Sequence, residues 1–400
     1  MITLSDILNA YGSDYLGKYS DTMPYNHKAA IRNILQCRTE KLGGQLYYCD
    51  QCKQYRYSYH SCGDRNCNKC QNDKAKEWLS KTTQLLLPVT HFLITFTMPD
   101  ILRQTARANQ VLFYNILFQA ASSALQTLAW DSKYVGGRIA IMAVLHTWTR
   151  TLNYHPHLHF LVPGGGLWPA CLVGRDDDNR WLSSCDKFLV PVLALSKLFR
   201  AQMQKLIKKH APVLYNSIPQ KLWNQKWVVH SKAVGAGQKA LRYLSEYLFR
   251  PAISNNRILS IDNNVITFNY IDSKTQFKKT MRLPSEEFIR RYLQHVLPKG
   301  FVKVRYFGLF SNANRKLLAE VRKSIPSGIE SLPHNHYHNQ NKPVTVKAKE
   351  KTKTSKIIIC PHCNRPMRNI GTLPKLSYSD KSPPDIPPLS SGQLANVIIN

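Results

Sequence analysis

The chain has 400 residues, of which 55 are Lys or Arg and 24 are Asp or Glu, so its formal net charge is +31. At about 150 residues per domain this length predicts two or three domains, and a hydrophobic share of 43% excludes a wholly disordered chain. The positive excess predicts an acidic partner, first of all DNA or RNA. No apolar run approaches the ~18 residues of a membrane-spanning helix, and the first residues lack a secretion-signal pattern. We therefore expect a soluble cytoplasmic protein with no membrane partner.

The expected elements begin after a cysteine-rich first segment that ends near Gln71. From there to about Arg322, strand-like and helix-like runs alternate, as in one large α/β or α+β domain. Beyond about Ser324 the composition becomes that of a linker or tail, rich in His, Asn, Lys, Pro and Ser. The expected strands are 91–98, 138–145, 157–162, 263–270 and 301–308, and the expected helices are 100–128, 193–210, 237–249 and a helix from Ser285.

Two CxxC pairs in the first segment predict a metal site. Cys49 with Cys52 and Cys67 with Cys70 are separated by fourteen residues, and four thiolates satisfy tetrahedral Zn²⁺. Such a site is structural, because four thiolates leave no open position for water or substrate. Basic and tyrosine side chains between the cysteines suit phosphate contact and base stacking, although a solvated basic face is the alternative.

Four further cysteines extend this prediction. Cys37 and Cys62 are left over, so they form a second site or replace one of the four thiolates above. Cys360 and Cys363 make half a zinc site in the tail, which His362 or upstream histidines could complete. The sequence does not decide between these alternatives.

A histidine-rich strand predicts a second kind of metal site. His155, His157 and His159 alternate, so they share one face of a strand, and His157 and His159 lie roughly 6.6 Å apart along it. The alternate residues from Leu158 to Val162 would face the core. Two imidazoles on a rigid strand can share a divalent cation and leave positions open for phosphate oxygens and water, as a Lewis-acid site requires.

Two tyrosines four residues apart lie on one helix face. Tyr243 and Tyr247 share their helix with Arg242. Such a pair is more often packing than chemistry. A phenol with a pKa near ~10 is a poor nucleophile, but nearby cations and a metal-polarised phosphate would allow it to attack a phosphodiester and form a covalent intermediate.

Taken together, these segments resemble the rolling-circle insertion-sequence transposases, a branch of the His-hydrophobic-His (HUH) endonucleases with an N-terminal zinc-binding domain. The resemblance lies in CRTEKLGGQLYYCDQC (37–52) and SCGDRNCNKCQ (61–71), LHTWTRTLNYHPHLHFLVPGGG (145–166), ALRYLSEYLFRPAISNNRI (240–258) and EEFIRRYLQHVLPKGFVKVRYFGLF (286–310). It implies an α+β fold, with a palm-like antiparallel sheet and flanking helices preceded by a small zinc-stapled module. The implied domains are a zinc-binding domain (1–76), a catalytic domain (77–323) and a basic, Pro-rich tail (324–400).

The resemblance also implies a mechanism. One tyrosine of the pair Tyr243 and Tyr247 would cleave single-stranded DNA at the element's end, forming a 5′-phosphotyrosine and freeing a 3′-hydroxyl. His157 and His159 would bind Mg²⁺ or Mn²⁺, with His155 as the third ligand and His146 as a weaker candidate. Arg150 stands where the relatives tend to have Gln, and Asn66 where they tend to have His. The residues expected to contact DNA are Lys232, Arg242 and Arg257. The setting would be the nucleoid of a prokaryotic cell.

Two other functions compete with this interpretation. A plasmid replication initiator or relaxase would use the same chemistry, but the zinc module and the segment from Glu286 speak against it. A non-enzymatic zinc-dependent nucleic-acid-binding protein would explain the charge and the CxxC pairs, yet it leaves the histidine strand without a purpose.

Overall fold

The computed structural model describes residues 1–168, 181–249, 251–325 and 357–376, without the side chains of 72, 73, 246, 247 and 324. The chain divides into two compact units. Within the described ranges, the larger unit holds residues 1–31 and 71–325, and the smaller unit holds 32–70 and 357–376. None of the helices in these ranges combines the length and the apolar composition that crossing a bilayer requires.

This division differs from the predicted domain boundaries. Residues 1–31 were expected to belong with the cysteine cluster, but their helix α1 (Leu4–Tyr19) packs in the larger unit against α10 (Ser285–Leu293). The reason is apolar burial, since Leu4, Ile7 and Leu8 are almost fully buried. Residues 357–376 instead join the cysteine cluster. Most of the expected tail lies outside the described residues.

The larger unit is built on a five-stranded sheet in which every neighbouring pair is antiparallel. This confirms the predicted α+β class with an antiparallel sheet. Its strands, in spatial order, are β12 (Val304–Gly308), β4 (Ala140–Trp148), β5 (Tyr154–Pro163), β3 (His91–Thr97) and β8 (Val229–Ala233).

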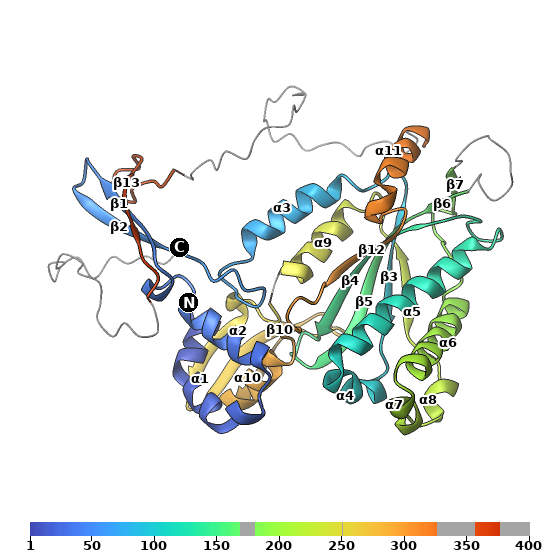
Figure 1. The fold of residues 1–400 in the computed structure, drawn as a ribbon, viewed down its shortest axis with the longest axis horizontal. Coiled ribbons are helices and arrows are strands. Elements are labelled where there is room, and N and C mark those ends of the chain that lie inside the picture. Colours follow the sequence, from blue (N-terminus) through green and yellow to red (C-terminus); the bar gives the residue numbers. More distant parts are fainter. Residues whose placement is uncertain (169–180, 250, 326–356, 377–400) are drawn as a thin grey trace. The chain divides into compact units, whose positions relative to one another are not determined.

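Helices cover both faces of this sheet (Figure 1). On one face, Leu158, Phe160 and Val162 are fully buried with residues of α5 and α6, as their alternation predicts. On the other face, α9 packs over β4 and β5 with α3 beside it. The helices of the first face are α4 (Asp100–Ala108), α5 (Gln110–Trp130) and α6 (Val192–His210), and those of the second are α3 (Asn72–Thr83), α9 (Gln238–Phe249) and α11 (Arg315–Ser324).

The one helix expected over 100–128 is two helices. Asn109 separates α4 from α5, because its backbone (φ −127°, ψ 49°) is not helical. This break places residues 107–112 at an exposed corner of the unit, where they line a cavity described below.

The remaining elements of the larger unit surround the sheet. A second antiparallel sheet, in the order β11-β10-β9, lies next to α10. These elements are α2 (Tyr25–Gln36), which runs on into the smaller unit, β6 (Gly165–Leu167), β7 (Trp181–Ser183), α7 (Pro212–Ser217), α8 (Lys221–Asn224), β9 (Ile258–Asp262), β10 (Val265–Ile271) and β11 (Lys278–Pro284).

The smaller unit is a three-stranded antiparallel sheet in the order β13-β1-β2, formed by β1 (Gly44–Cys49), β2 (Gln54–Tyr59) and β13 (Arg368–Leu373). The pairing of β1 with β13 joins two parts of the chain that are more than three hundred residues apart. It thereby brings Cys360 and Cys363 of the tail next to Cys49 and Cys52.

Candidate active site and cysteine clusters

Three histidines from two neighbouring strands converge on one face of the central sheet. Antiparallel pairing of β4 with β5 places His146 directly opposite His157, and alternation along β5 adds His159 to the same face. One ring nitrogen from each lies within 4.8 Å of the other two. His146 Nδ1 and His157 Nε2 lie 2.9 Å apart. The predicted pair is therefore brought together, with His146 as the third member.

The structure places His155, the expected third ligand, outside this group. Its Nδ1 contacts the guanidinium group of Arg103 on α4, and it does not belong to the three-nitrogen group. The cause is strand register: His155 precedes His157 by two residues, whereas His146 pairs with His157 across the ladder. His155 still lines the same cavity.

Hydrogen bonds orient the rings of the predicted pair. His157 Nδ1 donates to the His155 carbonyl at 2.7 Å, and His159 Nδ1 is hydrogen-bonded to the Thr95 hydroxyl at 3.0 Å. Each bond occupies Nδ1 and turns Nε2 toward the group, where His157 Nε2 contacts His146 Nδ1 and a bound cation would take the place of that contact. Burial lowers the pKa of His157 to about 3 and that of His159 to about 4, so both are neutral near pH 7. Neutral imidazole is the form that binds metal ions, so this group fits a divalent cation.

Tyr243 faces the histidines from helix α9. Its ring centroid lies 6.1 Å from that of His159, and 39% of the residue is exposed. Tyr243 and the three histidines line one cavity of about 850 Å³, in which the histidines are 5–8% exposed. An exposed phenol thus lies over buried imidazoles in a space large enough for a nucleotide. The side chain of Tyr247, the other predicted nucleophile, lies outside the described residues.

Contacts at both ends hold α9 in place. At its start, Gly237 (φ +80°) lies against the His91 ring, so closely that an added Cβ would stand 2.9 Å from His91 Cγ. At its end, Lys303 Nζ donates to the Leu248 carbonyl at 3.2 Å and lies 4.9 Å from the centre of the Trp148 ring. That cation also suits the negative end of the helix dipole. The position of Tyr243 therefore depends on β3 and on the residue just before β12 as well as on its own helix.

Only one of the three predicted DNA-contacting residues lines the cavity. Arg257 does, and its guanidinium group donates to the carbonyls of Asn269 (2.8 Å) and Arg150. Lys232 lies exposed on edge strand β8, opposite Leu93 and on the histidine-bearing face, but not in the cavity wall. Arg242 is exposed on α9 next to Tyr243.

Further polar residues of this site were not predicted from the sequence. Thr95 and Thr97 on β3 pair with His159 and His157, and both line the cavity. Their signal is present in the strand HFLITFT, where polar residues alternate with apolar ones. Asp272 lies in the turn directly after β10 of the second sheet, and no pattern in the sequence connects it to the histidines.

The cysteines of the smaller unit form two groups of four. Both groups have all their sulfur atoms within 4.8 Å of one another, and none of the described cysteines forms a disulfide. The CxxC pairs 49–52 and 67–70, predicted to share one ion, lie in different groups, because β1 pairs with β13 and brings the tail pair 360–363 to the first knuckle, while Cys37 and Cys62 join the pair 67–70. The two groups are Cys37, Cys62, Cys67 and Cys70, and Cys49, Cys52, Cys360 and Cys363.

The geometry of both groups fits tetrahedral Zn²⁺. Zinc–sulfur bonds of about 2.3 Å put neighbouring sulfurs about 3.8 Å apart, and the hydrogen-bonded sulfur pairs lie 3.2–3.9 Å apart. The knuckles at Cys49 and Cys360 have the same backbone form: Lys53 and Asn364, both with positive φ, donate to the carbonyl of the first cysteine at 2.8 and 2.9 Å. With four thiolates in each group, no position stays open for a substrate.

Comparisons with known proteins agree with this geometry. Residues 140–317 match a family described as "Putative transposase", and residues 7–98 match a "Transposase zinc-binding domain". The chain is 32% identical to the "Putative transposase y4qJ" of Sinorhizobium fredii, over 90% of this chain and 93% of that protein. It is 29% identical to the "Transposase for insertion sequence element IS801" of Pseudomonas savastanoi pv. phaseolicola, over 70% of each chain. No solved structure matches the chain. The chain therefore belongs to the family of insertion-sequence transposases that carry a zinc-binding domain, and its function is DNA transposition.

Proposed function

We propose that this transposase cuts and rejoins single-stranded DNA at the ends of its element through a covalent bond between Tyr243 and a 5′-phosphate. The reaction requires a divalent cation held by His146, His157 and His159. One observation carries the proposal: an exposed phenol and three buried imidazoles face one cavity, with the Tyr243 and His159 rings 6.1 Å apart.

The chemistry follows from these groups. Tyr243 Oη attacks the phosphorus, so an Oη–P bond forms and the P–O3′ bond breaks. The phenol loses its proton and the leaving 3′-oxygen gains one, so the net products are a 5′-phosphotyrosine and a free 3′-hydroxyl. The bound cation supplies Lewis-acid polarisation of the phosphate oxygens. Arg257, in the same cavity wall, adds positive charge where negative charge develops.

The depth of the histidines supports an unpaired substrate. Because they are 5–8% exposed, a scissile phosphate has to enter the cavity to reach them. A single strand can do so without the cost of unpairing, which a duplex has to pay. The +31 charge of the chain favours binding of either form. Element ends and target strands are thus the proposed DNA partners, in the cytoplasm and at the nucleoid of a prokaryotic cell.

The ligand set bears on the choice of cation. Three imidazole nitrogens suit a transition-metal ion, whereas Mg²⁺ prefers oxygen ligands. Of the two expected cations, Mn²⁺ therefore fits this group better than Mg²⁺. Tyr247, one helical turn after Tyr243, is proposed as the second nucleophile, because joining donor and target strands needs more than one transesterification.

A denaturing gel with end-labelled oligonucleotides from the element ends tests the proposal. The wild type should give a slower, protease-sensitive adduct with Mn²⁺, and Tyr243→Phe should abolish it. Tyr134→Phe is the matched control, since that phenol lies near Phe188 and outside the cavity wall. Full adduct formation by Tyr243→Phe would overturn the assignment of the nucleophile.

The same gel tests the third metal ligand. His146→Ala should abolish the Mn²⁺-dependent adduct, while His155→Ala should reduce it less. The reverse order would restore His155 as the ligand. Retarded DNA in native gels, without an adduct from any candidate end, would favour a protein that binds nucleic acid without cutting it.

A further inference from the structure

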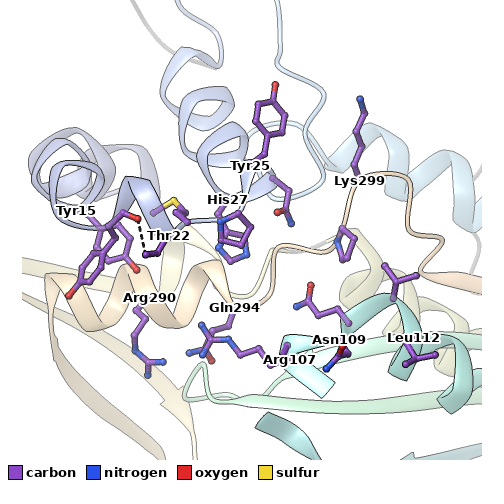
Figure 2. Close-up of a pocket in the computed structure, with 18 of the residues that line it drawn as sticks. Tyr15, Thr22, Tyr25, His27, Arg107, Asn109, Leu112, Arg290, Gln294 and Lys299 are labelled. Atoms are coloured by element: carbon purple, nitrogen blue, oxygen red, sulfur yellow. Dashed lines mark hydrogen bonds between the residues drawn. The ribbon is translucent and has the colours of Figure 1, made fainter. Parts of the chain in front are cut away.

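A second cavity, of about 860 Å³, opens in the larger unit (Figure 2). It shares no lining residue with the cavity of the histidines. Its walls come from α1, the start of α2, the junction of α4 with α5, and α10 with the residues after it. Its volume is typical of sites for small ligands, which span about 300–1,000 Å³. The catalytic chemistry proposed above does not use it.

Two guanidinium groups converge in this cavity. The side-chain amide of Gln294 lies between them, and with its oxygen turned toward the arginines it accepts hydrogen bonds from Arg107 Nη1, at 2.9 Å, and from Arg290 Nη1. Arg290 also has an acidic partner, since its Nη2 donates to Glu287 at 2.8 Å. Among the residues that the structure describes, no carboxylate forms an ion pair with Arg107. Partial burial of its guanidinium group and the neighbouring Arg290 lower the pKa of Arg107. The residue as a whole is exposed, so an anion can reach it and would offset the repulsion between the two cations.

Several of the other lining groups suit a nucleobase. Tyr15 and Tyr19, whose ring centroids lie 4.8 Å apart, line one side, and Tyr25, which is 70% exposed, also borders the cavity. His27 and Gln294 also line the cavity (Figure 2). Aromatic faces stack on bases of any sequence, and amide and imidazole groups can hydrogen-bond their edges. Sulfate or phosphate alone would need only the arginines, so this lining favours a nucleotide.

A basic helix edge leads from the catalytic cavity to this one. Arg103 and Arg107 lie four residues apart on α4, so their Cβ atoms are about 5–6 Å apart on one face. Arg103 contacts His155, which lines the catalytic cavity, and Arg107 lines the second. A strand whose phosphate enters the first cavity can therefore follow α4 into the second.

We propose that the second cavity, the Arg107 pocket, binds one unpaired nucleotide of the same DNA strand, with its phosphate at Arg107 and its base among the tyrosine rings. This inference rests on the proposed function, because it takes that strand to be single-stranded DNA. It assigns to α1 and α2 a role in recognising the element end, next to the site that cuts it.

Fluorescence anisotropy without divalent cations tests the pocket. The probe is the single-stranded end oligonucleotide, and a series carries one abasic site at each position in turn. The wild type should lose affinity about tenfold at one position and much less elsewhere. Arg107→Gln should bind the intact strand about tenfold more weakly and lose the dependence on that position. For Tyr25→Ala, affinity should no longer depend on the position of the abasic site, but this variant should bind the intact strand more tightly than Arg107→Gln does.

Arg200→Gln is the matched control, because it removes the same charge from α6, outside both cavity walls. A thermal melt of each variant establishes that it is folded. A flat abasic series in the wild type would overturn the proposal, and so would equal effects of Arg107→Gln and Arg200→Gln. The wild-type adduct with Mn²⁺ on the same oligonucleotide tests the proposed function separately. If the adduct forms but affinity is the same for every abasic position, only the nucleotide-binding role of the Arg107 pocket is refuted. If affinity depends on the abasic position but no adduct forms, only the cleavage chemistry is refuted.

Discussion

Replacing Gly237 by alanine should displace the helix that carries Tyr243. Gly237 has φ +80°, a conformation that costs an L-residue roughly 1–2 kcal/mol. The new Cβ would also meet the His91 ring at 2.9–3.2 Å, and His91 is fully buried, so the ring has little room to move. Overpacking of this kind costs about 1–3 kcal/mol. The free energy of unfolding should therefore fall by about 2–5 kcal/mol.

Gly235→Ala provides the matched control. Gly235 belongs to the same loop and has φ +59°, but an added Cβ would meet nothing within 4 Å. Its unfolding free energy should fall by only about 1–2 kcal/mol, from the backbone conformation alone. Urea unfolding measures both variants, and single-turnover adduct formation at a temperature where both are folded measures the position of Tyr243. Gly237→Ala should form the adduct more slowly than Gly235→Ala. Equal stability and equal rates in the two variants would refute the role of the His91 contact.

Three further predictions concern other groups. Burial lowers the pKa of His91 to about 4, below the ~6.5 of an unfolded chain, so the unfolded state takes up a proton first as the pH falls. His91 alone should contribute on the order of 2–3 kcal/mol to the loss of stability between pH 7 and 4.5 that urea unfolding measures, and the other buried histidines add to this loss; His91→Asn should make the total loss smaller by about the His91 contribution, and an equal loss would contradict the burial argument. Metal analysis should find two zinc ions per wild-type chain and one in Cys363→Ser, while Cys185→Ser, outside both clusters, should keep two; two ions in Cys363→Ser would refute the second cluster. Thr95→Val removes the hydroxyl bonded to His159, so the Mn²⁺ concentration for half-maximal adduct should rise about 10–100-fold, and an unchanged titration would show that this bond does not orient the ligand.

The histidine site shows which part of a metal site the alternation of residues along a strand can predict. Alternation alone predicted that His157 and His159 share a face, because it is a property of one strand. The third member, His146, depends on the register between two strands, which is set by the hairpin that joins them. His155 has the same spacing from His157 as His159 does. The pattern therefore could not show that His159 joins His146 and His157, whereas His155 contacts Arg103.

The cysteines show the limit of spacing rules. Two CxxC pairs fourteen residues apart are typical of one shared ion, and the extra Cys37 and Cys62 left a second site or a replaced ligand open without deciding between them. The separation of the two pairs results from the pairing of β1 with β13, which no local pattern encodes. The half-site at Cys360 and Cys363 was visible in the sequence, but its partners were not.

The Arg107 pocket depends on contacts between elements that lie far apart in the sequence, so local patterns predict it less well than the cysteine groups. It combines residues of α1, α4 and α10 that are remote in sequence. The apolar residues that pack α1 against the larger unit do not indicate which other residues will line the cavity beside it. The broader features were predictable, since hydrophobic periodicity gave most strands and helices of the larger unit, and the motif order gave the family. The sequence did not indicate the helices of residues 1–36.

The central claim is that Tyr243 becomes covalently attached to DNA. The most direct test is tandem mass spectrometry of the adduct formed with Mn²⁺, after digestion with trypsin and a nuclease. Cleavage after Arg242 releases a peptide that contains both Tyr243 and Tyr247, so fragmentation has to assign the modified residue. We expect a nucleotide phosphate on Tyr243. Modification of any residue outside this peptide, or of Tyr247 alone, would contradict the assignment.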